Sequence, residues 1–82
     1  MKASVEISMY PLIEQYEQPI LNFIQRLRQN EKLVVQTNTM STQIFGEYDV
    51  IMTTLSAAMK ATFEEEKQVV MVLKIINMDL EP

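Results

Sequence analysis

The sequence predicts an α+β fold whose elements follow the order β-α-β-β-α-β. Two observations lead to this prediction. Apolar residues alternate with polar ones over residues 3–10 but recur at helical spacing over residues 16–29. Two short strand-like runs, a second helical stretch and a long apolar run follow between residues 33 and 78. Such an order forms a four-stranded antiparallel sheet with both helices on one face, the ferredoxin-like arrangement.

The first strand and the first helix have the clearest patterns. Ala3–Tyr10 alternates between apolar and polar side chains, which is typical of a half-buried strand. Pro11 is expected to end it. Tyr16–Gln29 carries an apolar stripe at helical spacing and predicts a helix. Pro19 fits this helix only within the first turn, where its missing N–H has no intrahelical partner to lose.

The middle of the chain predicts two short strands and a turn. Leu33–Thr39 and Thr42–Phe45 are the expected strands, joined near Met40 and ended by Gly46. Threonine favours strands, whereas asparagine, serine and glycine favour turns. The same short polar side chains can also donate and accept hydrogen bonds to a neutral heteroaromatic ligand. The residues leave both interpretations open, because they do not fix which side of the sheet each one occupies.

A second helix is expected to begin at Tyr48 or Asp49, with Asp49 as its N-cap, and to end at Phe63 or Glu64. Three successive glutamates follow, Glu64–Glu66. Successive helical residues point about 100° apart, so these carboxylates cannot converge on one cation. We therefore interpret them as a solvated turn.

The last strand, Val69–Met78, is apolar on both faces. Right-handed crossovers place the first and third strands in the centre of the sheet and this strand at an edge. Two helices cover only one face, so the other face is left with exposed apolar side chains. Such a patch usually marks an interface. We therefore predict that the open face meets a second copy of the chain, in a homodimer or a homotetramer.

Polar side chains of the first strand lie on this open face, and Glu6 is the most informative of them. Burying an unpaired carboxylate costs roughly several kcal/mol, so we expect the Glu6 carboxylate to have a partner. Lys74 on the last strand is a structural candidate. A bound ligand with an amine or a positive charge is the functional one.

Composition narrows the function further. The 82 residues predict one domain, 1–82, with a net charge of −4 and 22% charged residues. Seven scattered basic residues exclude a strip for nucleic acid. The chain has no cysteine and no histidine, which removes thiolate or histidine catalysis and nearly every zinc site. We therefore expect a cytoplasmic protein that is not an enzyme, needs no metal or cofactor and does not insert into a membrane.

Two motifs of the chain resemble those of a known family: Ser8-Met9-Tyr10-Pro11 at the end of the first strand, and Thr37-Asn38-Thr39-Met40-Ser41-Thr42 before Gly46. Through them the sequence resembles the thiamine-binding protein family of ferredoxin-like domains. It implies a single-domain, non-catalytic member that assembles into dimers or tetramers and binds thiamine or its hydroxymethylpyrimidine part. Members that bind thiamine carry an aspartate at the position of Asn38, so a neutral relative of thiamine is the alternative ligand.

The resemblance also implies which residues contact the ligand. They are Glu6, Ser8, Tyr10, Thr37, Asn38, Ser41 and Thr42. A second hypothesis of another class is an oligomeric interaction or regulatory module without a thiamine site, in which these polar side chains join the subunits. Replacing Glu6 discriminates between the two hypotheses.

Overall fold

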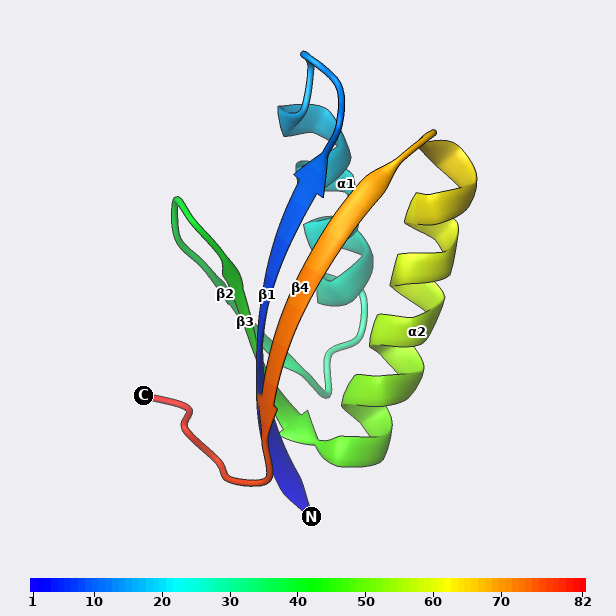
Figure 1. Ribbon diagram of the computed structural model, residues 1–82. Helices are drawn as coiled ribbons and strands as arrows, with labels where there is room; N and C mark the ends of the chain where they lie inside the picture. Colours follow the sequence, from blue (N-terminus) through cyan, green and yellow to red (C-terminus); the bar gives the residue numbers. More distant parts are fainter.

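The computed structural model describes residues 1–82 and has the predicted order of elements (Figure 1). The elements are β1 (Lys2–Pro11), α1 (Glu17–Arg28), β2 (Val34–Thr37), β3 (Thr42–Glu47), α2 (Tyr48–Glu65) and β4 (Val69–Ile76). The strands form one antiparallel sheet in the order β2-β3-β1-β4. The ferredoxin-like fold is confirmed, with β1 and β3 in the centre as the crossover rule predicts.

The core lies between the sheet and the two helices, which cover the same face (Figure 1). Every second residue of β1 points into it: Ala3, Val5 and Ile7 are at most 2% exposed. The other buried apolar residues of this cluster are Phe23, Leu27, Leu33, Ile44, Ile51, Leu55 and Ala58. Burying one large apolar side chain contributes about 1.5–3 kcal/mol. The alternation of β1 therefore supplies three of the ten core residues, and the helices supply five.

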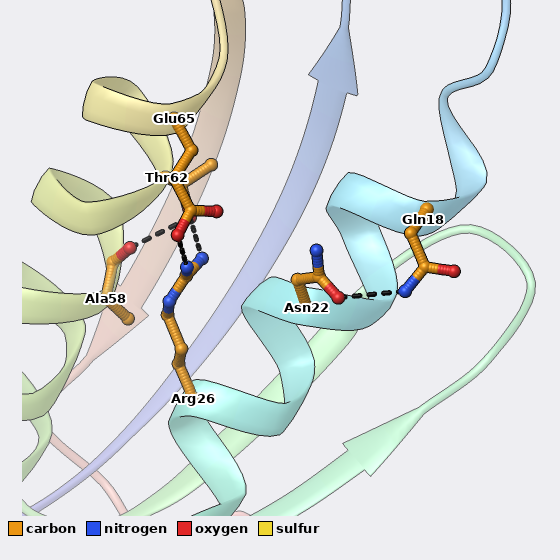
Figure 2. Close-up of polar contacts among 6 residues, drawn as sticks. All are labelled: Gln18, Asn22, Arg26, Ala58, Thr62 and Glu65. Carbon is orange, nitrogen blue, oxygen red and sulfur yellow. Dashed lines mark hydrogen bonds and ion pairs between the residues drawn. The ribbon is translucent and has the colours of Figure 1, made fainter.

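A polar contact also joins the two helices (Figure 2). The guanidinium of Arg26 on α1 donates to the hydroxyl of Thr62, at 3.3 Å, and pairs with the carboxylate of Glu65 on α2. Thr62 is 1% exposed and donates in turn to the carbonyl of Ala58, at 2.9 Å. The expected solvated turn at Glu64–Glu66 is thus wrong for Glu64 and Glu65, which belong to α2.

Two strands are shorter than the sequence pattern predicts. β2 stops at Thr37 instead of Thr39, because Asn38 Oδ1 accepts the backbone N–H groups of Met40 and Ser41, both at 2.8 Å, and starts a turn. β4 stops at Ile76 instead of Met78. Beyond it the chain folds back toward β1. In both places a side chain to backbone hydrogen bond ends a run that propensity alone would continue.

Gly46 lies inside β3, so the expectation that it ends this strand is wrong. Its φ is not positive, and the reason for a glycine is space. A Cβ at this position would lie 2.7 Å from Leu33 Cδ2. The side chain of Leu33, itself 8% exposed, therefore packs directly on the strand backbone.

α2 begins at Tyr48, one of the two predicted starts, and ends at Glu65, one residue later than predicted. Its N-cap is Glu47, which makes no side-chain capping bond. The predicted cap at Asp49 is wrong: this carboxylate lies in the first turn, where it still interacts favourably with the helix dipole. Neither helix is both long and apolar enough for a membrane crossing.

Candidate functional site

The open face of the sheet carries polar side chains from β1 beside apolar ones from β4. The register pairs Ser8 with Val72 and Tyr10 with Val70, on the face away from the helices. Val70 and Val72 are 46% and 54% exposed. The predicted apolar open face is therefore present, and it surrounds a polar centre.

Glu6 is that centre. The register places Lys74 opposite it, and Lys74 Nζ lies 2.9 Å from Glu6 Oε1. The Ser41 hydroxyl donates to the other carboxylate oxygen at 3.0 Å. The hydrogen bond from Lys74, and then the one from Ser41, holds the pKa of Glu6 below its ordinary value of 4.5, and Glu6 raises the pKa of Lys74 above 10.5. The predicted Glu6–Lys74 pairing is confirmed.

The turn between β2 and β3 positions Ser41 beside this pair. Asn38 Oδ1 accepts the N–H groups of Met40 and Ser41, and the Asn38 backbone N–H donates to the Ser41 carbonyl at 3.0 Å. Ser8 on β1 donates to the Met40 carbonyl at 3.4 Å, which ties the turn to the sheet. The side-chain carbonyl of Asn38 is therefore engaged in the turn, while its side-chain amide nitrogen is available to a ligand.

A cavity of about 490 Å³ lies between β1 and this turn. We refer to it as the open-face cavity. It is lined by Glu6, Ser8, Tyr10, Asn38, Thr39, Met40 and Ser41. Five of the seven residues that the family resemblance implies are therefore brought together around one cavity. Its volume falls in the range typical of small-molecule sites, roughly 300–1,000 Å³.

Thr37 and Thr42 lie elsewhere. They are paired with each other across β2 and β3, and Thr42 is also paired with Ile7 of β1, so all three occupy the helix-covered face. Thr42 is 6% exposed and lines a separate cavity on that side. Thr37 lines none of the cavities described here. The four-residue turn Asn38–Ser41 sets this register, which the sequence pattern left open.

Sequence reasoning missed a second hollow on the open face, on the other side of the Glu6–Lys74 pair. The chain after β4 folds back here: the Ser4 hydroxyl donates to the Met78 carbonyl at 2.7 Å and accepts the Leu80 N–H at 2.9 Å. Glu6, Lys74 and Leu80 help to line a cavity of about 320 Å³ at this place. The apolar Leu80 within an acidic tail was the available signal.

Gln43 is a further residue of the open face that the sequence pattern did not single out. It is paired with Glu6 on one side and with Gln36 on the other. Its position follows from alternation along β3, once Thr42 is assigned to the helix-covered face. Gln43 lines the 320 Å³ cavity beside Glu6.

Among known protein families, the one described as thiamine-binding protein matches residues 5–79 of this chain. The chain belongs to the thiamine-binding protein family. The match covers both motifs that suggested the resemblance, and it includes every residue around the open-face cavity. No curated protein is significantly similar in sequence.

Solved structures of similar proteins place this family member among close structural relatives. A protein from Streptococcus pneumoniae is 26% identical with a TM-score of 0.88, over 98% of this chain and 90% of its own. A hypothetical protein from Methanocaldococcus jannaschii is 25% identical with a TM-score of 0.82, over 99% and 84%. A Thermotoga maritima protein, provisionally named for thiamine biosynthesis or salvage, shares the fold at 20% identity and a TM-score of 0.83, over 95% and 85%.

Proposed function

We propose that this thiamine-binding family member binds thiamine, or its hydroxymethylpyrimidine part, in the open-face cavity and catalyses no reaction on it. One observation supports this most: the half-buried Glu6 carboxylate is oriented by Lys74 and Ser41 at the edge of a cavity of small-molecule size. The name of the Thermotoga maritima relative, which refers to thiamine biosynthesis or salvage, agrees with the proposal.

The pyrimidine ring suits the groups around the cavity. Its amino group is a donor, and the Glu6 carboxylate keeps acceptor capacity beyond its bonds to Lys74 and Ser41. Its ring nitrogens are acceptors, to which the side-chain amide nitrogen of Asn38 can donate hydrogen bonds. Tyr10, 53% exposed, offers an aromatic wall. Because Lys74 already neutralises Glu6, we expect the neutral pyrimidine to contribute more to affinity than the cationic thiazolium.

A second copy of the chain completes the proposed site. Val70, Val72 and Ile76 are between 42% and 54% exposed on the same face as the cavity. Covering them removes apolar surface from water and closes the cavity, which otherwise opens to solvent. Shielding from water would also strengthen hydrogen bonds to a ligand beside Glu6.

Isothermal titration with thiamine and with hydroxymethylpyrimidine tests the proposal. Wild-type protein should release or absorb heat with both, and Glu6→Gln should lose binding while its sedimentation stays unchanged. Glu64→Gln, the same chemical change at the exposed end of α2, is the matched control and should bind like the wild type. Absence of heat and of a thermal shift at millimolar ligand would rule the proposal out.

A second candidate function is an interaction module without a thiamine site, and the Glu6–Lys74 pair at 2.9 Å favours it. In this case the carboxylate needs no ligand, because a neighbouring strand already supplies its counter-charge. Glu6→Gln would then change the stability or the assembly of the oligomer, and no ligand titration would respond to it.

A further inference from the structure

We propose that the outer edge of β4 pairs with β4 of a second copy, antiparallel and centred on Leu73, so that the two sheets become continuous. β4 is an outer strand of the sheet, and no strand of the chain pairs with its free side (Figure 1). This contact lies in the plane of the sheet, whereas the contact proposed for the open face stacks one sheet on another. Each can form without the other.

The helices leave β4 uncovered on the very face that they cover elsewhere. Val5 of β1 is paired with Ile75 of β4, and Ile7 is paired with Leu73, so each pair shares the helix-covered face. Val5 and Ile7 are both 2% exposed, but Ile75 is 51% and Leu73 is 40% exposed. A copy docked on the open face cannot cover these two side chains, because they point away from it. A partner at the edge of β4 can.

α2 carries an apolar stripe beside this uncovered strand. Met52, Met59 and Phe63 recur after seven and four residues, so they lie on one side of the helix. Thr54, which accepts a hydrogen bond from Asn30 next to α1, points to the opposite side. The crossover from β3 to β4 carries α2 over β1, so the stripe faces the β4 edge. Pairing at that edge brings the stripes of both copies over the joined strands.

The two edges of the sheet differ in how they are protected. β2, at the other edge, has four residues and ends at Thr37. β4 has eight residues, of which none is proline and only Lys74 is charged. Natural edge strands usually avoid so long an apolar run, because its free N–H and C=O groups invite another strand. Pairing with a second strand satisfies these groups.

A second copy is the occupant that suits the charge and pattern of β4. Residues directly opposite in an antiparallel pair share a face, so apolar residues of β4 meet apolar ones on both faces when the strand pairs with itself. Its one charge, Lys74, lies on the open face and is already paired with Glu6 at 2.9 Å. The partner therefore needs no counter-charge, and two-fold symmetry lets both strands gain the same contacts.

The exposed side chains select the register. Five apolar residues of β4 are at least 40% exposed: Val70, Val72, Leu73, Ile75 and Ile76. A pairing centred on Leu73 includes all five, because Leu73 then meets its own copy and Met71 meets Ile75. A centre at Val72 leaves Ile76 outside the paired strands. A centre at Lys74 sets two lysines opposite each other, which is destabilising.

Both ends of β4 leave its outer side open. After the strand, the Ser4 hydroxyl donates to the Met78 carbonyl and accepts the Leu80 N–H, so the chain turns over β1 and not outward. Before the strand, the Gln68 carbonyl accepts the Leu12 N–H at 3.1 Å, which also directs the chain toward β1. Neither connection crosses the path of a strand that docks along β4.

Cysteine cross-linking of the full chain tests the register, because the sequence has no cysteine of its own. Leu73→Cys should form a disulfide-linked dimer on mild oxidation, since its two thiols meet at the centre of the pairing. Met71→Cys and Ile75→Cys should each stay unlinked, whereas the double variant should link, because these two positions lie opposite each other. Non-reducing gel electrophoresis measures the linked fraction.

Ile75→Lys tests the same contact without a cross-link. The new charge would be buried between the joined strands and the two α2 stripes, so the dissociation constant of this contact should rise more than about tenfold. Sedimentation velocity should then show half the wild-type mass, whether the wild type is a dimer or a tetramer. Leu21→Lys is the matched control, because Leu21 is 52% exposed on α1, and it should keep the wild-type mass.

Three results would overturn the inference. The first is a wild type that stays monomeric at millimolar concentration, which would leave the β4 edge to some other protein. The second is an Ile75→Lys variant that is folded by circular dichroism and keeps the wild-type mass. The third is a Leu73→Cys variant that links no more than Met71→Cys does. If Val72→Cys links with itself and Leu73→Cys does not, the copies meet through their open faces alone. The cross-links decide the matter if Ile75→Lys does not fold.

Discussion

The two faces of the sheet use neighbouring residues of the same strands for different purposes. On the helix-covered face, Val5 and Ile7 are 2% exposed and belong to the core. On the open face, Glu6 is half-buried and ion-paired, and Val72 is 54% exposed. Neighbouring positions of β1 thus differ strongly in burial, although successive residues of a strand lie only about 3.3 Å apart.

The difference teaches that the residues that stabilise the fold are separate from the residues of the proposed binding site. Core side chains hold the strands and helices together, whereas the open face stays free to meet a ligand or a second copy. One end of the covered face is an exception, because a cavity of about 510 Å³ lined by Phe23 and Thr42 hollows it there. Four substitutions or conditions test this division, and they are taken from the largest expected effect on folding to the smallest.

Ile7→Ala should have the largest effect on folding. Its side chain is almost fully enclosed between β1 and the helices, so the loss of buried contacts and the cavity left behind should lower the free energy of unfolding by about 2–5 kcal/mol. Urea unfolding measures this. Val72→Ala, which also removes methyl groups but from the open face, is the matched control. Equal losses in both variants would contradict the division between the faces.

Gly46→Ala should have the next largest effect. A Cβ would lie 2.7 Å from Leu33 Cδ2, so Leu33 must shift within the core, at a cost of about 1–3 kcal/mol. Thermal and urea unfolding check the loss. In a Leu33→Ala background the same change should cost clearly less, because the clashing atom is gone. Additive losses would show that the contact is not the cause.

Val72→Lys should barely change the folding of one protomer but should weaken its assembly. The residue is more than half exposed, so the free energy of unfolding should stay within about 0.5 kcal/mol. A lysine in the centre of the apolar open face would have to be buried by a second copy. Sedimentation velocity should therefore detect a shift toward monomer, and Lys60→Glu, an equally drastic change on the exposed side of α2, should not produce it.

The smallest expected effect on folding is that of pH on the Glu6–Lys74 pair. Because the pKa of Glu6 is lowered in the folded chain, its contribution is present above its ordinary value of 4.5 and is lost as pH falls through the lowered value. The raised pKa of Lys74 acts in the opposite sense: its contribution is fully present below its ordinary value of 10.5 and is lost as pH rises through the raised value. Melting temperatures measured across pH should fall less steeply on the acid side in Glu6→Gln.

The wild type and Glu6→Gln should also converge at low pH, since Glu6 is then protonated in both the folded and the unfolded chain. A constant difference between them at every pH would mean that Glu6 acts through packing and not through charge.

Much of the fold could be predicted because alternation and helical spacing are local properties. The period of β1 alone separates Val5 and Ile7 from Glu6, and the same reasoning on β4 places Lys74 on the side of Glu6. Their pairing was therefore foreseeable once the order of strands was known. The family of the chain followed from the motifs at the ends of β1 and β2.

What could not be predicted depends on contacts between distant residues. Arg26 pairs with Glu65, 39 residues away, and no pattern within α2 indicates it. Gly46 is required by the approach of Leu33, which only the packed structure reveals. Thr37 and Thr42 were grouped with Glu6, but the length of the turn at Asn38 sends their side chains to the other face. A one-residue change in that turn would reverse them.

The folded-back tail limits how a neighbour can approach. Its hydrogen bonds to Ser4 hold Leu80 over one end of the open face, where Phe45 is only 4% exposed. If a second copy docks on the open face as proposed, its sheet cannot reach that end without displacing the tail, so the two copies would overlap chiefly at the opposite end, around Tyr10 and Val70. The segment from Met78 to Leu80 would then act as a positional stop and would centre the paired sheets on the half that contains the open-face cavity.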